Sequence, residues 1–203
     1  MTRILLLVLI ISGGWQLGSG SWIWAKARLA QWLLESSWSE MLQQQDHHSI
    51  KPWPWADTHA TARLEVPALN VSMIVLQGDS GRTLAFGPGH SSDSAAPGEP
   101  GTTVISGHRD THFAFLQQLK PGIGLQLQTL QGEWRYRVLE TQVVDSRNGG
   151  VSVPDDQHGL LLVTCYPFEA LEPGGPLRYL VWAEPDSTHP LTSQAKTDNK
   201  TII

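Results

Sequence analysis

Short stretches in which apolar and polar residues alternate, separated by turn-forming residues, constrain the fold of this chain more than any other feature. A period of two places successive side chains on opposite faces of a β-strand. The alternation is nearly strict in Gly124–Leu130 and continues in Trp134–Leu139 after a Gln-Gly turn. Further strands are predicted at Ala62–Val66, Val71–Leu76, Thr102–Ser106, Gly159–Cys165 and Leu177–Glu184. About seven or eight such strands, with short helices such as Phe113–Leu119, predict an all-β domain that is either a small barrel or a sandwich.

The N-terminal residues differ from this pattern. Arg3 precedes a run of aliphatic residues, and no further charge occurs until Lys26. An uncharged span of about 20 residues is what an α-helix needs to cross a membrane. We expect residues 1–24 to be an uncleaved membrane anchor with its N-terminus in the cytoplasm, because Trp22 and Trp24 lie where an interfacial aromatic belt would lie. A cleaved signal peptide is the alternative, since Ala25-Lys26-Ala27 fits a small-x-small cleavage site.

Residues 25–60 are expected to connect this segment to the β domain. Ala25–Gln45 has the spacing of an amphipathic helix, whose apolar stripe consists of Ala30, Leu34, Trp38, Met41 and Leu42. The helix either lies against the membrane or the β domain, or forms a stalk with one packed face. The two prolines in Lys51–Asp57 end the helical pattern and mark a domain boundary. Residues 185–203 are polar, and we expect a loose tail.

Cys165 is the single cysteine of the chain and ends the apolar run that begins at Leu160. One cysteine permits no internal disulfide, and an unpaired cysteine in an exported protein is potentially reactive. A small buried apolar residue is the plainer interpretation. The net charge of -5, without any stripe of basic residues, argues against nucleic acid as a partner.

Two further residues at predicted strand ends complete a plausible reactive set with Cys165. His108 follows the strand Thr102–Ser106, and Arg178 begins the strand after the one that carries the cysteine. A thiol with its ordinary pKa of about 8.5 is mostly protonated at neutral pH, so a nearby histidine and a fixed positive charge would activate it. A guanidinium also stabilises the oxyanion of acyl transfer. Taken singly, His108 is interpreted as a turn residue and Arg178 as a solvated side chain.

A zinc site is the competing interpretation of the same region. His108, Asp110 and His112 are closely spaced, and Cys165 would add a soft ligand. The stretch lacks the glutamate of the helical His-Glu-x-x-His motif and follows a strand rather than lying on a long helix. We therefore expect neither a metal nor another cofactor.

The region from Ala62 to Glu184 resembles the sortases, the cysteine transpeptidases of bacterial surfaces. The stretches that carry the resemblance are Leu64-Glu65-Val66-Pro67, Phe86-Gly87-Pro88-Gly89-His90, Val104-Ile105-Ser106-Gly107-His108-Arg109, Leu162-Val163-Thr164-Cys165, and Arg178. The resemblance implies an eight-stranded β-barrel, a catalytic domain over residues 61–184, and no cofactor. It implies that Cys165 forms an acyl-thioester, that His108 serves as acid and base, and that Arg178 stabilises the oxyanion or positions the substrate.

The resemblance also implies a substrate and a location. Sortases cleave a C-terminal sorting signal of the Leu-Pro-x-Thr-Gly type in an exported protein and pass the acyl group to an amine. The segment Pro52–Asp57 and the sequence Thr-Cys-Tyr-Pro-Phe resemble the sortase group of Gram-negative proteobacteria, which places the domain in the periplasm on a single-pass inner-membrane anchor. A cysteine hydrolase and a non-catalytic binding or scaffold module on the same barrel remain as alternatives.

Two residues are weaker candidates for substrate binding. Thr164 lies on the opposite face of an ideal strand from Cys165, so its hydroxyl or backbone amide would reach a substrate only through a bend at the strand end. His90 follows a Gly-Pro-Gly turn and either lines the groove or belongs to the turn itself.

Overall fold

The computed structural model describes residues 28–44, 50–149, 158–170, 172 and 174–186, together with the backbone of 192–193. The strands are β1 (Ala60–Val66), β2 (Val71–Gln77), β3 (Gly89–His90), β4 (Thr102–Ser106), β5 (Gly124–Gln128), β6 (Gly132–Asp145), β7 (Gly159–Cys165), β8 (Leu177–Pro185) and β9 (Thr192–Ser193). Short helical turns are η1 (Pro67–Leu69), α2 (Gly81–Leu84), η2 (Ala114–Gln118) and η3 (Ser146–Asn148). A longer helix occupies residues 28–44.

Two predicted segments fall largely beyond these residues. The membrane anchor expected at residues 1–24 lies outside the described part of the chain, and so does the tail from residue 187 onward, apart from β9. Within the described ranges, no helix combines the length and the apolar character that a membrane span requires.

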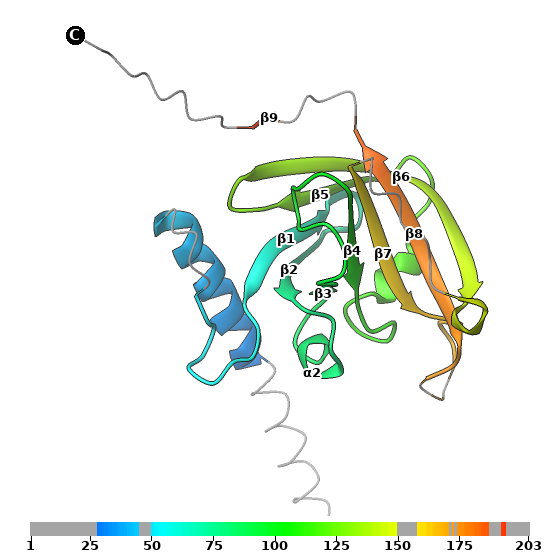
Figure 1. The fold of residues 1–203 in the computed structure, drawn as a ribbon, viewed down its shortest axis with the longest axis horizontal. Helices are drawn as coiled ribbons and strands as arrows, with labels where there is room; N and C mark the ends of the chain where they lie inside the picture. Colours follow the sequence, from blue (N-terminus) through cyan, green and yellow to red (C-terminus); the bar gives the residue numbers. More distant parts are fainter. Residues whose placement is uncertain are drawn as a thin grey trace, which may run out of the picture.

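Strands β1 to β8 close into a single barrel (Figure 1). The order around the barrel is β5-β1-β2-β3-β4-β7-β8-β6, and β6 pairs back with β5. Neighbouring strands are antiparallel, except that β2 with β3 and β4 with β7 are parallel. Closure through β5 and β6 confirms the predicted eight-stranded barrel and rules out the sandwich. The two residues of β9 add to the start of β6 at Gly132 and Glu133.

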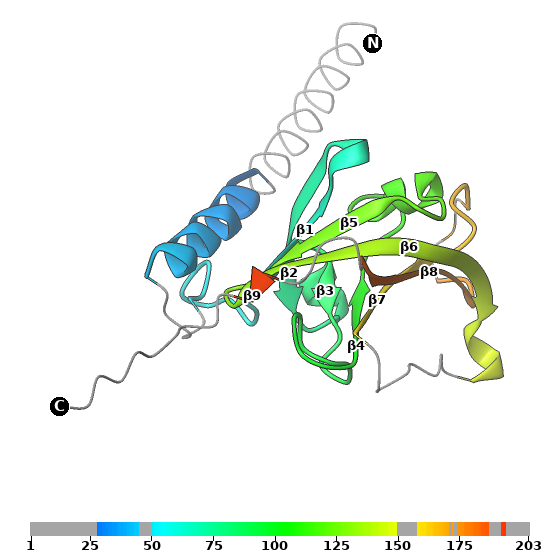
Figure 2. The same ribbon diagram turned by 90° about the horizontal axis from the view of Figure 1, so that it is seen from above.

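Alternate side chains fill the interior of the barrel, as the period of two predicts. Leu64 and Val66 of β1, with Leu125 and Leu127 of β5, are fully or almost fully buried in one apolar cluster. Figure 2 shows β6 running along the whole barrel, where it pairs first with β5 and then with β8. The interior cluster is completed by side chains from β7, β8 and η2, including Leu160, Leu162, Val181, Phe115 and Leu116.

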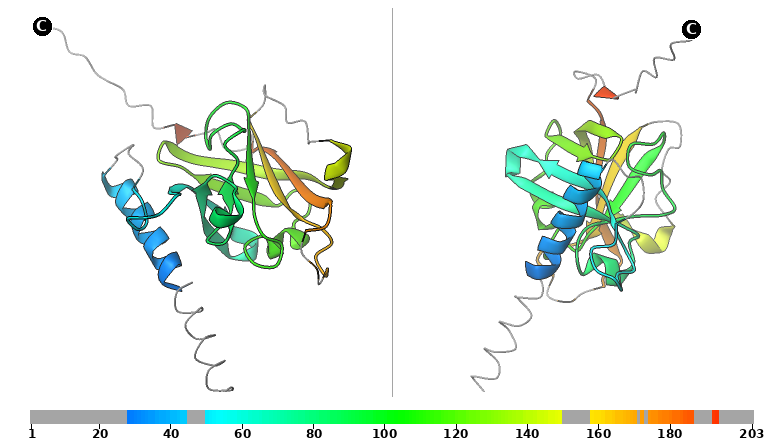
Figure 3. Two further views of the ribbon diagram at one scale, coloured as in Figure 1. Left: turned by 60° about the horizontal axis from the view of Figure 1, so that its bottom comes forward. Right: turned by 90° about the vertical axis from the view of Figure 1, so that its left-hand side faces the viewer.

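The helix of residues 28–44 packs on the outside of the barrel, over β1 and β2 (Figure 3). Its buried residues Leu34, Trp38 and Met41 form a second apolar cluster with Ala60, Ile74 and Leu76 of those strands. Four of the five residues predicted for the apolar stripe are buried, and the fifth, Leu42, is 36% exposed. Ile74, Val75 and Leu76 are all buried because β2 is covered on both faces, by the interior on one side and by the helix on the other.

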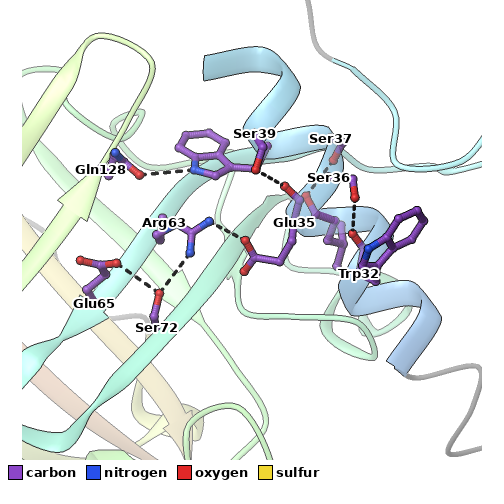
Figure 4. Close-up of polar contacts among 11 residues, drawn as sticks. Trp32, Glu35, Ser36, Ser37, Ser39, Arg63, Glu65, Ser72 and Gln128 are labelled. Atoms are coloured by element: carbon purple, nitrogen blue, oxygen red, sulfur yellow. Dashed lines mark hydrogen bonds and ion pairs between the residues drawn. The ribbon is translucent and has the colours of Figure 1, made fainter. Parts of the chain in front are cut away.

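Polar contacts surround this apolar contact (Figure 4). The Glu35 carboxylate on the helix pairs with the Arg63 guanidinium on β1. Ser72 of β2 accepts a hydrogen bond from Arg63 and donates one to Glu65. The Trp38 indole N–H points to the Gln128 side-chain oxygen at 3.4 Å. The helix is therefore fixed against the barrel and belongs to the same folded unit in the described residues.

Two strands differ from their predicted form. β3 is only two residues long and lies within the stretch Phe86–His90, where the sequence predicts a turn. β6 extends far beyond the predicted Trp134–Leu139. Its pairing with β8 shifts register between Val138 and Glu140, which is where the prediction ended. This irregularity breaks the alternation that reveals a strand in the sequence.

Candidate active site

Parallel pairing of β4 with β7 brings His108 close to the end of the cysteine strand. The last pair in the register is Ser106 with Val163, so two more residues along each chain lead to His108 and Cys165. Beyond the strand, the Gly107 N–H donates to the Val163 carbonyl at 3.1 Å. The Thr164 hydroxyl donates to the Gly107 carbonyl at 2.7 Å. The residue before His108 is therefore held to β7 through both of its backbone groups.

Gly107 is required at this position for steric reasons. A Cβ atom placed on it would lie 2.7 Å from the Phe113 ring, which is itself completely buried in the interior cluster. The Phe113 N–H in turn donates to the His108 carbonyl at 2.9 Å. The His108 side chain is exposed, while its backbone is anchored to β7 on one side and to the turn before η2 on the other.

Antiparallel pairing of β7 with β8 places Arg178 directly opposite Cys165. Leu160 and Leu162 of β7 and Val181 of β8 face the interior, so alternation directs Cys165 and Arg178 to the outer face. Cys165 is a free, partly exposed thiol. The Arg178 Nη1 donates to the carbonyls of Gly175 and Leu177 at 2.6 and 3.0 Å. The three residues that the sequence predicts therefore come together at one end of the adjacent strands β4, β7 and β8 (Figure 1).

The two weaker candidates have contacts within the protein. Thr164 is 3% exposed and uses its hydroxyl for the bond to Gly107, so it connects β7 to the segment that carries His108. His90 is also 3% exposed. One of its ring nitrogens lies 2.9 Å from the Ala95 carbonyl and 3.2 Å from the Ser94 hydroxyl, contacts that hold the loop after β3.

His108 also lines a cavity of about 810 Å³, to which Cys165 and Arg178 do not contribute. It lies between the helix of residues 28–44, β2, α2 and η2, and its wall includes Gln31, Met73, His108 and His112. Burial lowers the pKa of His112 below its ordinary value, and the neighbouring His108 lowers it further. His108 therefore belongs both to the strand ends that carry Cys165 and Arg178 and to the wall of a cavity that has no Asp, Glu, Lys or Arg in its lining.

The residues of the zinc interpretation do not gather into a ligand set in the described part of the chain. No group of three or more His, Cys, Asp or Glu side chains there is arranged to hold a metal ion. The Asp110 carboxylate instead accepts a hydrogen bond from the Arg109 Nε at 3.1 Å.

Two features of the site were missed by the sequence reasoning. Arg109 is buried and its guanidinium contacts the connection between β7 and β8. Tyr166, Phe168 and Tyr179 form an aromatic cluster directly after the cysteine, in which Tyr166 and Tyr179 stack with ring centroids 6.1 Å apart. The position of Arg109 immediately after His108 was the available signal in the sequence, but a lone arginine in a turn is usually solvated.

Comparison with known proteins agrees with this arrangement. The family described as the sortase domain matches residues 64–186. Sortase D of Bacillus subtilis (strain 168) is 33% identical over 143 residues, which make up 70% of this chain and 70% of that protein. A sortase D5 transpeptidase of Clostridium perfringens has a similar fold, with a TM-score of 0.62, 21% identity, and coverage of 78% of this chain and 99% of that one. A Clostridium perfringens sortase C, solved with the C-terminal cell wall sorting motif, has a TM-score of 0.56 and 20% identity, and the match covers 80% of this chain and 90% of that one.

Proposed function

Because this chain belongs to the sortase family of cysteine transpeptidases, we propose that it cleaves a C-terminal sorting signal of the Leu-Pro-x-Thr-Gly type in an exported protein and transfers the acyl group to an amine. The observation that carries the proposal is the register of three neighbouring strands. It aligns His108, Cys165 and Arg178 at one end of the barrel, although they are far apart in the sequence.

In the first half of the proposed reaction, the Cys165 thiolate attacks the carbonyl carbon of the scissile peptide bond. The carbonyl oxygen becomes an oxyanion, and Arg178 is the nearest candidate to stabilise it, since the two residues are paired across β7 and β8. His108 gives a proton to the departing amine as the carbon–nitrogen bond breaks. The product is a thioester on Cys165 and a free amine on the released peptide.

In the second half, an incoming amine attacks the thioester carbon and gives a proton to His108. The carbon–sulfur bond breaks, a new amide forms, and the Cys165 thiolate is restored. The cavity that His108 lines leaves room for an acceptor beside the proposed base.

The sorting signal is supported by a related protein. The Clostridium perfringens sortase C structure contains a C-terminal cell wall sorting motif. The present chain has the same fold, and the outward Cys165 at the rim of the barrel is accessible to an extended peptide. The Tyr166, Phe168 and Tyr179 rings form a partly buried cluster close to the cysteine in the chain and on β8, and Phe168 and Tyr179 pack against the interior cluster.

We further propose that residues 1–24 anchor the enzyme in the inner membrane of a Gram-negative bacterium, with the catalytic domain in the periplasm. The support is the uncharged N-terminal span and the resemblance of the Pro-Trp-Pro-Trp segment to the proteobacterial sortases. Membrane fractionation followed by carbonate extraction tests the anchor. Protease treatment of spheroplasts tests the periplasmic side, and release of the protein with the periplasmic fluid would overturn the anchor.

The activity is tested by incubating the full-length chain with peptides of the Leu-Pro-x-Thr-Gly type and with the C-terminal segments of exported proteins from the same genome. Intact-mass measurement should detect an acyl adduct on the wild-type protein and none on Cys165→Ala. Added amines should then appear in the product. Ser106→Ala, a change on β4 outside the proposed reacting groups, serves as the control and should keep the adduct.

Three outcomes separate the candidate functions. An adduct that is released only to water, whatever amine is added, would make the protein a cysteine hydrolase. Absence of any adduct, with a Cys165 no more reactive toward iodoacetamide than free cysteine, would leave a non-catalytic binding module on a sortase barrel. Transfer to an added amine supports the proposal.

A further inference from the structure

Arg109, the residue after His108, makes hydrogen bonds to three backbone carbonyls in addition to its ion pair with Asp110. Its side chain is 4% exposed, and all three guanidinium nitrogens donate hydrogen bonds. Nε donates to Asp110, whose carboxylate is 66% exposed. A buried guanidinium whose anionic partner among the described residues faces solvent is costly unless its other donors are well satisfied.

The other donors all reach the connection between β7 and β8. Nη1 donates to the Pro167 carbonyl at 2.9 Å. Nη2 donates to the carbonyls of Ala170 and Glu172 at 2.6 and 3.0 Å. These acceptors lie between Cys165 and Arg178 in the chain, and they are about 60 residues from Arg109 in sequence, with separations of 58, 61 and 63.

Few other polar contacts hold this connection in the described residues. The Tyr166 N–H donates to the Leu177 carbonyl at 3.0 Å where the strands separate. The Ala170 N–H donates to the Pro167 carbonyl at 3.3 Å, and Arg178 itself holds the carbonyls of Gly175 and Leu177. At the end of the connection, Ser146 donates to the Pro176 carbonyl from its N–H at 2.9 Å and from its hydroxyl at 2.8 Å. If Arg178 turns toward a substrate oxyanion, it gives up carbonyl contacts near the end of the connection. The contacts of Arg109 near its beginning do not depend on that movement.

From these contacts we propose that Arg109 is a positioning residue that fastens the β7–β8 connection to the segment carrying His108, and so keeps Arg178 placed for acyl transfer. The planar shape of the guanidinium is needed as well as its charge, because its donors point in fixed directions toward three separate carbonyl groups. A lysine ammonium is a single point and does not span them. Among the described hydrogen bonds, none joins the Arg109 side chain to those of His108, Cys165 or Arg178.

The first test is independent of activity. Hydrogen–deuterium exchange of the full-length protein should show faster exchange at the Tyr166 and Ala170 amides, which donate to the carbonyls of Leu177 and Pro167, in Arg109→Met than in the wild type. Arg63→Met is the matched control, because Arg63 is also a partly buried arginine but pairs with Glu35 on the far side of the barrel. Unchanged exchange in the connection of Arg109→Met, or an equal increase in Arg63→Met, would overturn the proposal.

The second test measures acylation and rests on the proposed function for its readout. A misplacement of about 1 Å at a reacting group costs about 100-fold in rate, so Arg109→Met should lower kcat for acylation by about 10- to 100-fold with little change in KM. Arg109→Lys should recover little of this loss. Iodoacetamide should still alkylate Cys165 at a similar rate, because a small reagent does not need Arg178. Full recovery in Arg109→Lys would show that charge alone suffices and would contradict the proposal.

A double-mutant cycle with Arg178→Ala identifies the route of the effect. If Arg109 acts through Arg178, its loss should matter much less once Arg178 is gone, so the two changes should be strongly non-additive. Additive effects would overturn this route. If the wild type forms no acyl adduct, the proposed function fails, whereas the exchange experiment still decides whether Arg109 fastens the connection.

Discussion

The two sides of this barrel are held together by different kinds of contact. Over β1 and β2, the helix of residues 28–44 is held mainly by apolar side chains, with Trp38 completely buried among Leu34, Met41 and Ile74. At the ends of β4, β7 and β8, hydrogen bonds to backbone carbonyls hold the segments, as in the contacts of Thr164 and Arg109. Apolar burial is strong but non-directional, whereas hydrogen bonds fix distances and angles.

This difference indicates that the contacts of the helix mainly stabilise the fold, whereas the contacts at the strand ends mainly set the geometry of the proposed reacting groups. Changes on the helix side should alter the free energy of unfolding while leaving the chemistry of each folded molecule intact. Changes at the strand ends should alter the chemistry more than the stability.

Removing the buried tryptophan should have the largest effect on stability. Trp38→Ala is expected to lower the free energy of unfolding by about 3 to 5 kcal/mol, the usual cost of emptying such a site. Trp32→Ala is the matched control on the same helix, because Trp32 is 63% exposed and its loss should be almost neutral. Urea denaturation followed by circular dichroism measures both. If the acylation rate of Trp38→Ala falls by more than its fraction of folded protein does, the helix side also affects the chemistry, which would contradict this distinction.

Truncation of Arg178, which is paired with Cys165, should reduce activity strongly and stability only slightly. Arg178→Ala is expected to lower kcat/KM for acylation by about 10²- to 10³-fold, the typical loss when an oxyanion donor is removed. The free energy of unfolding should change by less than about 1 kcal/mol, as for most substitutions that leave no buried group unpaired. Arg135→Ala, in a surface ion pair with Glu133, should affect neither quantity. A large loss of stability in Arg178→Ala would make Arg178 a structural residue.

Thr164 is the case in which both effects should appear together. Thr164→Val keeps the shape of the side chain but leaves the Gly107 carbonyl without its 2.7 Å bond, at an expected cost of about 1 to 3 kcal/mol in stability. Acylation should also slow, because Gly107 precedes His108. Thr103→Val is the control, since the buried Thr103 hydroxyl bonds to Ala96 at 3.3 Å, away from the cysteine. Equal activity in the two variants would show that the contact of Thr164 is structural only.

The smallest effect concerns acid pH at the boundary between the two regions. Burial, and then His108, lowers the pKa of His112 from 6.5, so the folded protein resists protonation there more than the unfolded chain does. The unfolded state therefore binds more protons as the pH falls below 6.5, and stability is lost with it. In His112→Gln the free energy of unfolding should depend less on pH in this range, as measured by urea titrations at several pH values. An unchanged slope would contradict this contribution.

Long alternating segments made the barrel predictable. The interior residues of β1 and β5 could be identified from the sequence because a period of two directly reports which face is buried. The two residues of β3 could not, because pairing of so short a strand depends on its neighbours and leaves no periodicity. The full length of β6 was missed for a different reason, because its register with β8 shifts near Leu139 and the alternation is interrupted there.

The sequence predicted which residues form the site better than it predicted the contacts that hold the loops around it. His108, Cys165 and Arg178 each end or begin an apolar strand, so the pairing of those strands brings them together. His90 and Thr164 were considered for substrate contact, and the structure shows both in contacts that hold loops and strands. Burial of Arg109 was not predictable, since its carbonyl partners belong to a connection whose path depends on the finished fold.

The separation of these strands in the sequence also has a consequence for biosynthesis. Gly107 and Thr164 are 57 residues apart, and β5 and β6 lie between them in the chain, so the pair forms only after a long loop has closed. Arg178 leaves the translocation channel later still if the chain is exported from its N-terminus. On this view, the thiol stays latent in the nascent chain and becomes a nucleophile only in a protein whose barrel has already closed.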